Sequence, residues 1–220
     1  ALSTRDILTM QFLDGQPIER LADQSSALRN SVAASLTELA LREVFDWGLV
    51  QTDPNFANYL YAPGTNRIQL LDFGATRDYP QASRSALCKL LAACSGGSDD
   101  DLADAAAGVG YLADREPTGY RRSVVGLLRT ATEPLRAAQP FAFGGSDMAR
   151  RMSDAVLEMR LRDGFGRLPP TEVLYLHRKL GGLYLLLARL RAVVDVRALV
   201  APYLEIAQRR DATNAQQGAA

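Results

Sequence analysis

The chain has 220 residues, 47% hydrophobic and 23% charged, a composition that excludes a wholly disordered protein. Its 25 basic and 25 acidic residues give a formal net charge of +0, so no long-range field favours a nucleic-acid partner. No run reaches the roughly 18–20 apolar residues that span a bilayer. The nearest, residues 180–194, is interrupted by Arg189 and Arg191. We therefore expect neither nucleic-acid binding nor a transmembrane segment in this chain.

The predicted elements begin with a short β-like run from Ile7 to Leu13. Apolar residues then recur at helical spacing over residues 25–46, with Ser25 or Ser26 as the cap and Gly48 as the stop. We expect Trp47 to close this helix as a core residue.

Two strand-like segments, residues 59–62 and 67–74, flank a Pro-Gly turn and predict a β-hairpin. Beyond Pro80 the pattern is helical, and the predicted helices cover residues 81–95, 99–113, 117–138, 146–163, 170–191 and 195–209. The small, polar residues 209–220 are expected to fray. The predicted fold class is therefore mainly α with a small β-hairpin.

The chain has two cysteines and one histidine, which limits the metal sites and catalytic mechanisms that it can form. Cys88 and Cys94 lie in an apolar helical run without the further ligands of a zinc set, so we interpret them as core residues in a reducing compartment. His177, the single histidine, excludes mechanisms that need two. We interpret it as a packed or capping residue.

Polar residues flank the predicted hairpin at spacings that suit phosphoryl transfer. Asp53 and Asn58 have the D-x-x-x-x-N spacing of a kinase catalytic loop, and Asp72 opens a D-F-G triplet. We interpret Asp53 as the base or water-orienting residue. Asn58 and Asp72 are the candidate magnesium ligands, with Asp72 also reaching the β- and γ-phosphates of ATP. Each motif alone could simply cap a turn, but their joint occurrence in one strand–turn–strand unit favours the kinase-like interpretation.

The opening segment looks like the strand and hinge that join the two lobes of a kinase. Met10 would be the gatekeeper, and the backbone of Gln11 and Leu13 would meet the adenine edge. Leu60, two residues after Asn58, would form the apolar floor beneath the adenine ring. An ordinary strand and turn is the alternative for this stretch.

These residues resemble the UbiB/AarF family of atypical kinase-like proteins, in its coenzyme Q branch. The resemblance rests on Q-T-D-P-N at residues 51–55, on the D-F-G segment, and on later segments at residues 139–145, 167–192 and 201–204. It implies a protein kinase-like C-lobe that uses ATP and Mg in ubiquinone (coenzyme Q) biosynthesis. It also implies quinone-biosynthesis proteins or a lipid precursor as partners. The implied location is cytoplasmic or peripheral to the inner membrane, on the bacterial cytoplasmic face or in the mitochondrial matrix.

On this basis residues 1–14 are expected to be the hinge end of an N-lobe linker and residues 15–208 the C-lobe, with the catalytic hairpin at 51–79 and a disordered tail at 209–220. Both lysines, Lys89 and Lys179, follow the D-F-G triplet, so neither can be the upstream lysine that pairs the α- and β-phosphates. We therefore expect the N-lobe to be absent from this chain, and little turnover from these residues alone.

Asn55 departs from ordinary protein kinases, which have a lysine two residues after the catalytic aspartate. This favours ATP hydrolysis or small-molecule transfer over protein phosphorylation.

Two alternatives remain open. One is a non-catalytic nucleotide- or lipid-binding scaffold, with the apolar run Leu183–Leu187 lining a groove. The other is an aminoglycoside-type phosphotransferase, which Gln51 and Thr52 disfavour because such enzymes usually carry a histidine there.

Overall fold

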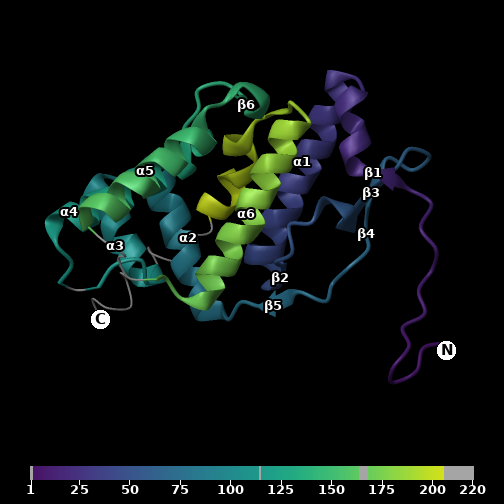
Figure 1. Cartoon of the computed structure of the whole chain (residues 1–220), viewed down its shortest axis with the longest axis horizontal. Coiled ribbons are helices and arrows are strands. Elements are labelled where there is room, and N and C mark those ends of the chain that lie inside the picture. Colours follow the sequence, from purple (N-terminus) through teal and green to yellow (C-terminus); the bar gives the residue numbers. More distant parts are fainter. Residues whose placement is uncertain (1, 114, 164–167, 206–220) are drawn as a thin grey trace.

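A computed structural model of the chain describes residues 2–113, 115–163 and 168–205 (Figure 1). The predicted tail at 209–220 lies outside the described residues, as does the end of the last predicted helix. Helices make up most of the described chain, and the strands are short. The predicted fold class is confirmed.

The first helical region sets up the candidate site. A 3-10 helix, η1 (Ile18–Asp23), leads into α1 (Ser26–Arg42), which continues as the π-helical turn η2 (Glu43–Trp47). The Ser25 side chain accepts a hydrogen bond from the backbone N–H of Leu28 at 3.4 Å, as a cap does. Gly48 ends the run with φ 66°, a left-handed conformation that favours glycine. The predicted cap and stop are thus confirmed.

The strands form three small antiparallel sheets. The first has the order β1 (Gln16–Pro17), β3 (Tyr59–Ala62) and β4 (Arg67–Leu70), in which β3 and β4 are the predicted hairpin. The second pairs β2 (Leu49–Gln51) with β5 (Thr76–Asp78), and the third pairs β6 (Phe141–Ala142) with β7 (Val193–Val194). The last two pairings join segments well separated in the chain, and we did not predict them.

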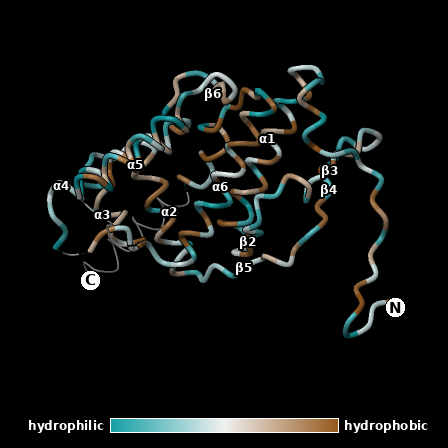
Figure 2. Tube along the Cα trace, viewed as in Figure 1, coloured by the Kyte–Doolittle hydropathy of each residue, from teal (hydrophilic) through white to brown (hydrophobic). Residues whose placement is uncertain are grey.

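The predicted β-like run from Ile7 to Leu13 is wrong, because these residues form no strand in the described chain. The segment runs away from the helical body and carries several hydrophobic residues (Figures 1 and 2). Four of its apolar side chains are exposed: Ile7, Leu8, Met10 and Phe12. A strand needs a partner to satisfy its backbone N–H and C=O groups, and the described chain supplies none here.

The remaining chain forms the helical body seen in Figure 1. Its longer helices are α2 (Gln81–Gly96), α3 (Asp99–Val109), α4 (Thr118–Ala131), α5 (Met148–Asp163) and α6 (Thr171–Arg189), and residues 196–205 are also helical. The single-turn 3-10 helices are η3 (Phe56–Asn58), η4 (Glu133–Leu135) and η5 (Phe143–Gly145). The predicted helix at 117–138 ends early because Pro134 lacks the N–H that would continue it. No described helix is both long and apolar enough to cross a lipid bilayer.

One hydrophobic core links these elements. Its largest fully buried aliphatic side chains come from η1, β2, α3, α6 and the segment after α6: Ile18, Leu21, Val50, Leu102, Leu186, Leu187, Leu190 and Val200. Burying one such side chain contributes about 1.5–3 kcal/mol. Cys88 and Cys94 are also buried, as predicted.

Trp47 is not a core residue, contrary to our prediction, because its side chain is 48% exposed. It is the last residue of η2, directly before the left-handed Gly48. The Arg42 guanidinium carbon lies 5.0 Å from the centre of its ring, a cation–π contact that covers one face of the indole.

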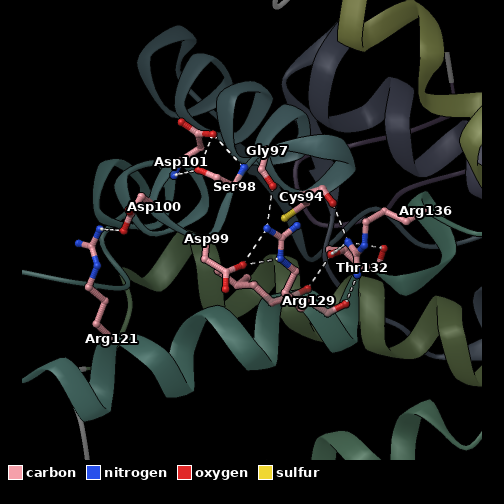
Figure 3. Close-up of polar contacts among 11 residues, drawn as sticks. Cys94, Gly97, Ser98, Asp99, Asp100, Asp101, Arg121, Arg129, Thr132 and Arg136 are labelled. Carbon is pink, nitrogen blue, oxygen red and sulfur yellow. Dashed lines mark hydrogen bonds and ion pairs between the residues drawn. The ribbon is translucent and has the colours of Figure 1, made fainter.

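Arg129 of α4 and Arg136, directly after η4, connect this part of the chain to the end of α2 and to the turn that follows it (Figure 3). Arg129 donates to the Gly97 carbonyl at 2.7 Å and to the Asp99 carboxylate at 2.9 Å, and Arg136 donates to the Cys94 carbonyl at 2.6 Å. Ser98 and Asp101 form a capping box at the start of α3. Burial raises the pKa of the Cys94 thiol. The arginine contacts therefore connect α4 and η4 to α2 and the start of α3.

Candidate functional site

Pairing of β2 with β5 brings the catalytic-loop motif beside the D-F-G triplet. The backbone N–H and the hydroxyl of Thr52 both donate to the Ala75 carbonyl, at 3.2 and 2.7 Å. The Gln51 amide Nε2 donates to the Asp72 carbonyl at 3.3 Å. Both Gln51 and Thr52 are buried. The two loops are thus held together at their bases, before their functional side chains begin.

The β3–β4 hairpin brings Asn58 beside Asp72. Tyr59 pairs with Leu70, and one step further the Leu71 N–H donates to the Asn58 carbonyl at 3.0 Å. The two polar residues therefore occupy the same end of the hairpin. They line one small hollow together with four other residues: Glu43, Gln51, Tyr59 and Leu70.

Asp53 joins this group through side-chain contacts. Its Oδ2 accepts a hydrogen bond from Asn58 Nδ2 at 3.0 Å, and its Oδ1 forms an ion pair with Arg178 of α6 at 3.2 Å. The Asp53 side chain is 27% exposed. The structure thus brings Asp53, Asn58 and Asp72 together, with the Asp53 carboxylate oriented by an amide and a cation.

The donor set at this site fits Mg²⁺. Asp72 is exposed, and its Oδ1 accepts the Gly74 N–H at 2.7 Å. Asn58 donates through Nδ2, so its Oδ1 is the atom it would present to a cation. The buried Gln51 Oε1 in the same hollow has no hydrogen-bond partner among the described residues. Among the described residues, no group of three or more His, Cys, Asp or Glu side chains is arranged so that it could hold a metal ion. Mg²⁺ nevertheless commonly takes only one or two protein ligands, with waters and phosphate oxygens completing its shell.

Helix α6 supplies residues that we did not assign to the site. Lys179 Nζ lies 2.8 Å from Glu43 Oε2 in an ion pair with side chains only 5% and 6% exposed, and it also donates to the Tyr59 hydroxyl at 3.2 Å. The Glu43 carboxylate accepts the backbone N–H of Gln51, and burial raises the pKa of Glu43 despite the neighbouring Lys179. This pair therefore links α6 and η2 to the start of the D-x-x-x-x-N loop.

The same face of α6 packs against the rest of the loop. At Gly182 an added Cβ would overlap Pro54 Cβ and lie 3.1 Å from Pro54 Cγ, so the absence of a side chain permits this close packing. Tyr175 accepts a hydrogen bond from Arg77 at 3.2 Å. Tyr175, Arg178, Lys179 and Gly182 follow the i, i+3, i+4, i+7 spacing of one helix face. Helical periodicity was visible in the sequence, but it could not show that this face meets the loop.

The predicted adenine-binding residues are not brought to this site. Met10 is 61% exposed, Gln11 is exposed and Leu13 is half-buried in the segment that runs away from the helices (Figure 1). Leu60 is half-buried in β3, opposite Pro17 and Gln69. Their roles toward adenine stay predictions.

His177 contacts a tyrosine and none of the three converging residues among those the structure describes. Its Nε2 hydrogen-bonds the Tyr111 hydroxyl, and the two rings stack with centroids 5.5 Å apart. This contact supports its interpretation as a packing residue.

A D-x-x-x-x-N loop and a D-F-G loop held together on a helical body define the class as a kinase-like C-terminal lobe. A solved structure, the complex of Rv3197 with erythromycin from Mycobacterium tuberculosis, has the same fold. It has a TM-score of 0.60 and 20% identity, covering 86% of this chain and 47% of that one.

Comparison by sequence gives the family. Residues 1–105 match the model of the ABC1 atypical kinase-like domain. The chain is 31% identical over 196 residues to the atypical kinase COQ8B, mitochondrial, of Danio rerio, covering 89% of this chain and 31% of that protein. It is also 31% identical over 204 residues to the atypical kinase COQ8, mitochondrial, of Saccharomyces cerevisiae, covering 90% and 39%. The predicted resemblance is confirmed: the chain is similar to the ABC1 and COQ8 atypical kinases. It spans about a third of the length of these relatives.

Proposed function

We propose that this chain is the catalytic lobe of a UbiB-type kinase or ATPase that binds ATP together with magnesium. The observation that carries the proposal is the convergence of Asp53, Asn58 and Asp72 from two loops joined by β2–β5 and β3–β4. Phosphoryl transfer depends mainly on positioning and charge neutralisation, and this arrangement can supply both.

Each of the three residues has a distinct proposed role. Asn58 and Asp72 hold Mg²⁺ through side-chain oxygens, and Asp72 also faces the β- and γ-phosphates. The bound ion neutralises charge on the phosphate oxygens. Asp53 orients the attacking hydroxyl or water and accepts its proton, a role for which the contacts from Asn58 and Arg178 position its carboxylate.

The proposed cellular role is in ubiquinone biosynthesis, with quinone-biosynthesis proteins or a lipid precursor as partners. The support is the similarity to proteins named COQ8 and COQ8B, which their names describe as mitochondrial. By the same similarity we propose a place at the inner membrane, on its matrix face or on the equivalent bacterial cytoplasmic face.

The test is metal binding and phosphate release by the natural full-length protein. Asp72→Asn should abolish tight Mn²⁺ binding in the presence of ATP, as measured by electron paramagnetic resonance. Asp53→Asn should keep that binding but slow phosphate release about 100-fold or more, the usual contribution of a positioned proton acceptor. Asp78→Asn, an exposed substitution on β5, is the matched control and should change neither quantity.

Phosphate release that persists in both Asp53→Asn and Asp72→Asn would contradict the catalytic roles. If Asp53→Asn abolished release yet still restored quinone synthesis in a deficient strain, the protein would be a scaffold. Within the run that we predicted to line such a scaffold's groove, Leu187 is 1% exposed and belongs to the core. Leu183 and Leu186 instead line a small hollow together with Pro54 and Phe56, so the scaffold stays the alternative.

A further inference from the structure

The catalytic loop itself lacks a cation next to its aspartate. Asn55 stands two residues after Asp53, and its Oδ1 accepts the backbone N–H of Ala57 at 3.0 Å. This side chain therefore caps its own turn. Transfer or hydrolysis of a terminal phosphate nevertheless develops negative charge that a nearby cation stabilises.

Arg178 brings a cation to the same place from a different element. Its NH2 lies 3.2 Å from Asp53 Oδ1, although 125 residues separate the two in the chain. The Arg178 side chain is 59% exposed, whereas that of Asp53 is 27% exposed. The guanidinium has several N–H donors in a planar fork, so one contact with Asp53 leaves others for an anionic oxygen.

The backbone that carries Arg178 is firmly held. Its neighbour Lys179 is buried in the ion pair with Glu43, and one turn further Gly182 lies against Pro54 of the catalytic loop. Arg178 thus projects from a part of α6 that is anchored by Lys179 and by the packing of Gly182 on Pro54. Arg77, the other arginine near these loops, is instead engaged with Tyr175, its guanidinium carbon 4.6 Å from the ring centre.

We propose that Arg178 binds the terminal phosphate of the nucleotide, supplying from α6 the positive charge that is absent at Asn55. The proposal rests on the proposed ATP-binding function and adds a residue to that site. The interaction is a charge-assisted hydrogen bond to a phosphate oxygen, with no covalent step assigned to the arginine. Because ATP has a γ-phosphate and ADP does not, Arg178 should distinguish ATP from ADP.

The test compares the dissociation constants of Mg·ATP and Mg·ADP in the natural full-length protein. Arg178→Ala should weaken ATP binding about ten- to a hundredfold, the loss expected for a hydrogen bond between charged groups, and leave ADP binding nearly unchanged. Arg178→Lys keeps the charge but not the planar fork, so its ATP affinity should lie between those of the unmodified protein and of Arg178→Ala. Arg189→Ala is the matched control, because Arg189 lies on the same helix, is 60% exposed and pairs with Glu19 away from the loop.

Equal weakening of ATP and ADP by Arg178→Ala would overturn the proposal and make the arginine a support for Asp53 alone. An unchanged ATP affinity would overturn it as well. If Arg178→Ala folds poorly, Arg178→Gln provides the same comparison with a longer polar side chain. Failure of the unmodified protein to bind either nucleotide would contradict the proposed function itself, whereas binding of both with an unaltered ratio in the variants would contradict only the role of Arg178.

Discussion

At the scale of single residues, Gly182 and Gly181 provide a neighbouring pair with opposite surroundings. A Cβ at Gly182 would overlap Pro54, whereas a Cβ at Gly181 would meet no atom within 4 Å. Gly182→Ala should therefore destabilise the fold by about 1–3 kcal/mol through overpacking. Gly181→Ala should stabilise it by up to about 1 kcal/mol, because alanine is the better helix former. Urea unfolding measures both, and effects of the same sign and size would contradict the packing of α6 on the loop.

Tyr79 gives a prediction for alkaline pH. Its hydroxyl donates to the Glu172 carbonyl at 2.6 Å, and burial, with the Glu172 charge adding to it, raises the pKa of Tyr79 from 10.0 to about 12. The folded protein therefore holds this proton where the unfolded chain releases it. The contribution of Tyr79 to stability is fully present below pH 10.0 and is lost as pH rises through about 12.

We expect Tyr79→Phe to make the decline of the unfolding free energy above pH 10.0 shallower. Near neutral pH the variant should lose only its hydrogen bond, about 1 kcal/mol. Urea titrations at a series of alkaline pH values measure this slope. A variant whose slope equals that of the unmodified protein would show that Tyr79 does not hold its proton in this way.

At the scale of elements, the ion pair between Lys179 and Glu43 joins α6 to η2. Lys179→Met would leave the Glu43 carboxylate buried without its cation, and breaking such a pair costs about 3–5 kcal/mol. The double variant Lys179→Met with Glu43→Leu should recover much of this loss, because it removes the uncompensated charge. Differential scanning calorimetry and urea unfolding check both expectations.

The exposed pair between Arg189 and Glu19 is the control for that prediction. Their side chains are 60% and 35% exposed, so Arg189→Met should cost less than about 1 kcal/mol. If the two single variants lost equal stability, the Lys179–Glu43 pair would not be the buried connection that the structure shows.

At the scale of the whole molecule, the N-terminal segment stands apart from the helical body. Ile7 is 63% exposed and Phe12 is 87% exposed, whereas Ile18, at the start of η1, is 0% exposed. Ile7→Thr should change the unfolding free energy by less than about 0.5 kcal/mol, as surface substitutions do. Ile18→Thr should lower the unfolding free energy by several times that amount, because it removes apolar burial and places a hydroxyl in the core.

Equilibrium unfolding of the two isoleucine variants measures this contrast directly. Comparable losses from Ile7→Thr and Ile18→Thr would mean that the segment packs on the body.

We also expect Ile7→Thr combined with Phe12→Ser to reduce self-association of the 220-residue chain in sedimentation experiments, because exposed apolar patches promote association.

Much of the local structure could be predicted from the chain alone. Residues 81–95 were expected to be helical and α2 covers Gln81–Gly96, since apolar periodicity is a local property. The hairpin of β3 and β4 followed from its Pro-Gly turn, and it explains why Asn58 and Asp72 meet. By contrast, the run from Ile7 to Leu13 has strand-like residues but no partner strand, and Trp47 has a core-type side chain at a position that faces solvent.

The amino-acid sequence by itself determined the helices, the hairpin, the two motif loops and the kinase-like resemblance, because these depend on neighbouring residues and their spacing. The tertiary structure alone decided that α6 lies against the candidate catalytic loop, where Arg178 contacts Asp53, Lys179 contacts Glu43 and Gly182 packs on Pro54. Which face of a helix meets which loop depends on packing between segments more than a hundred residues apart. Helical periodicity does not encode that choice, since the same face could bury itself against any apolar surface.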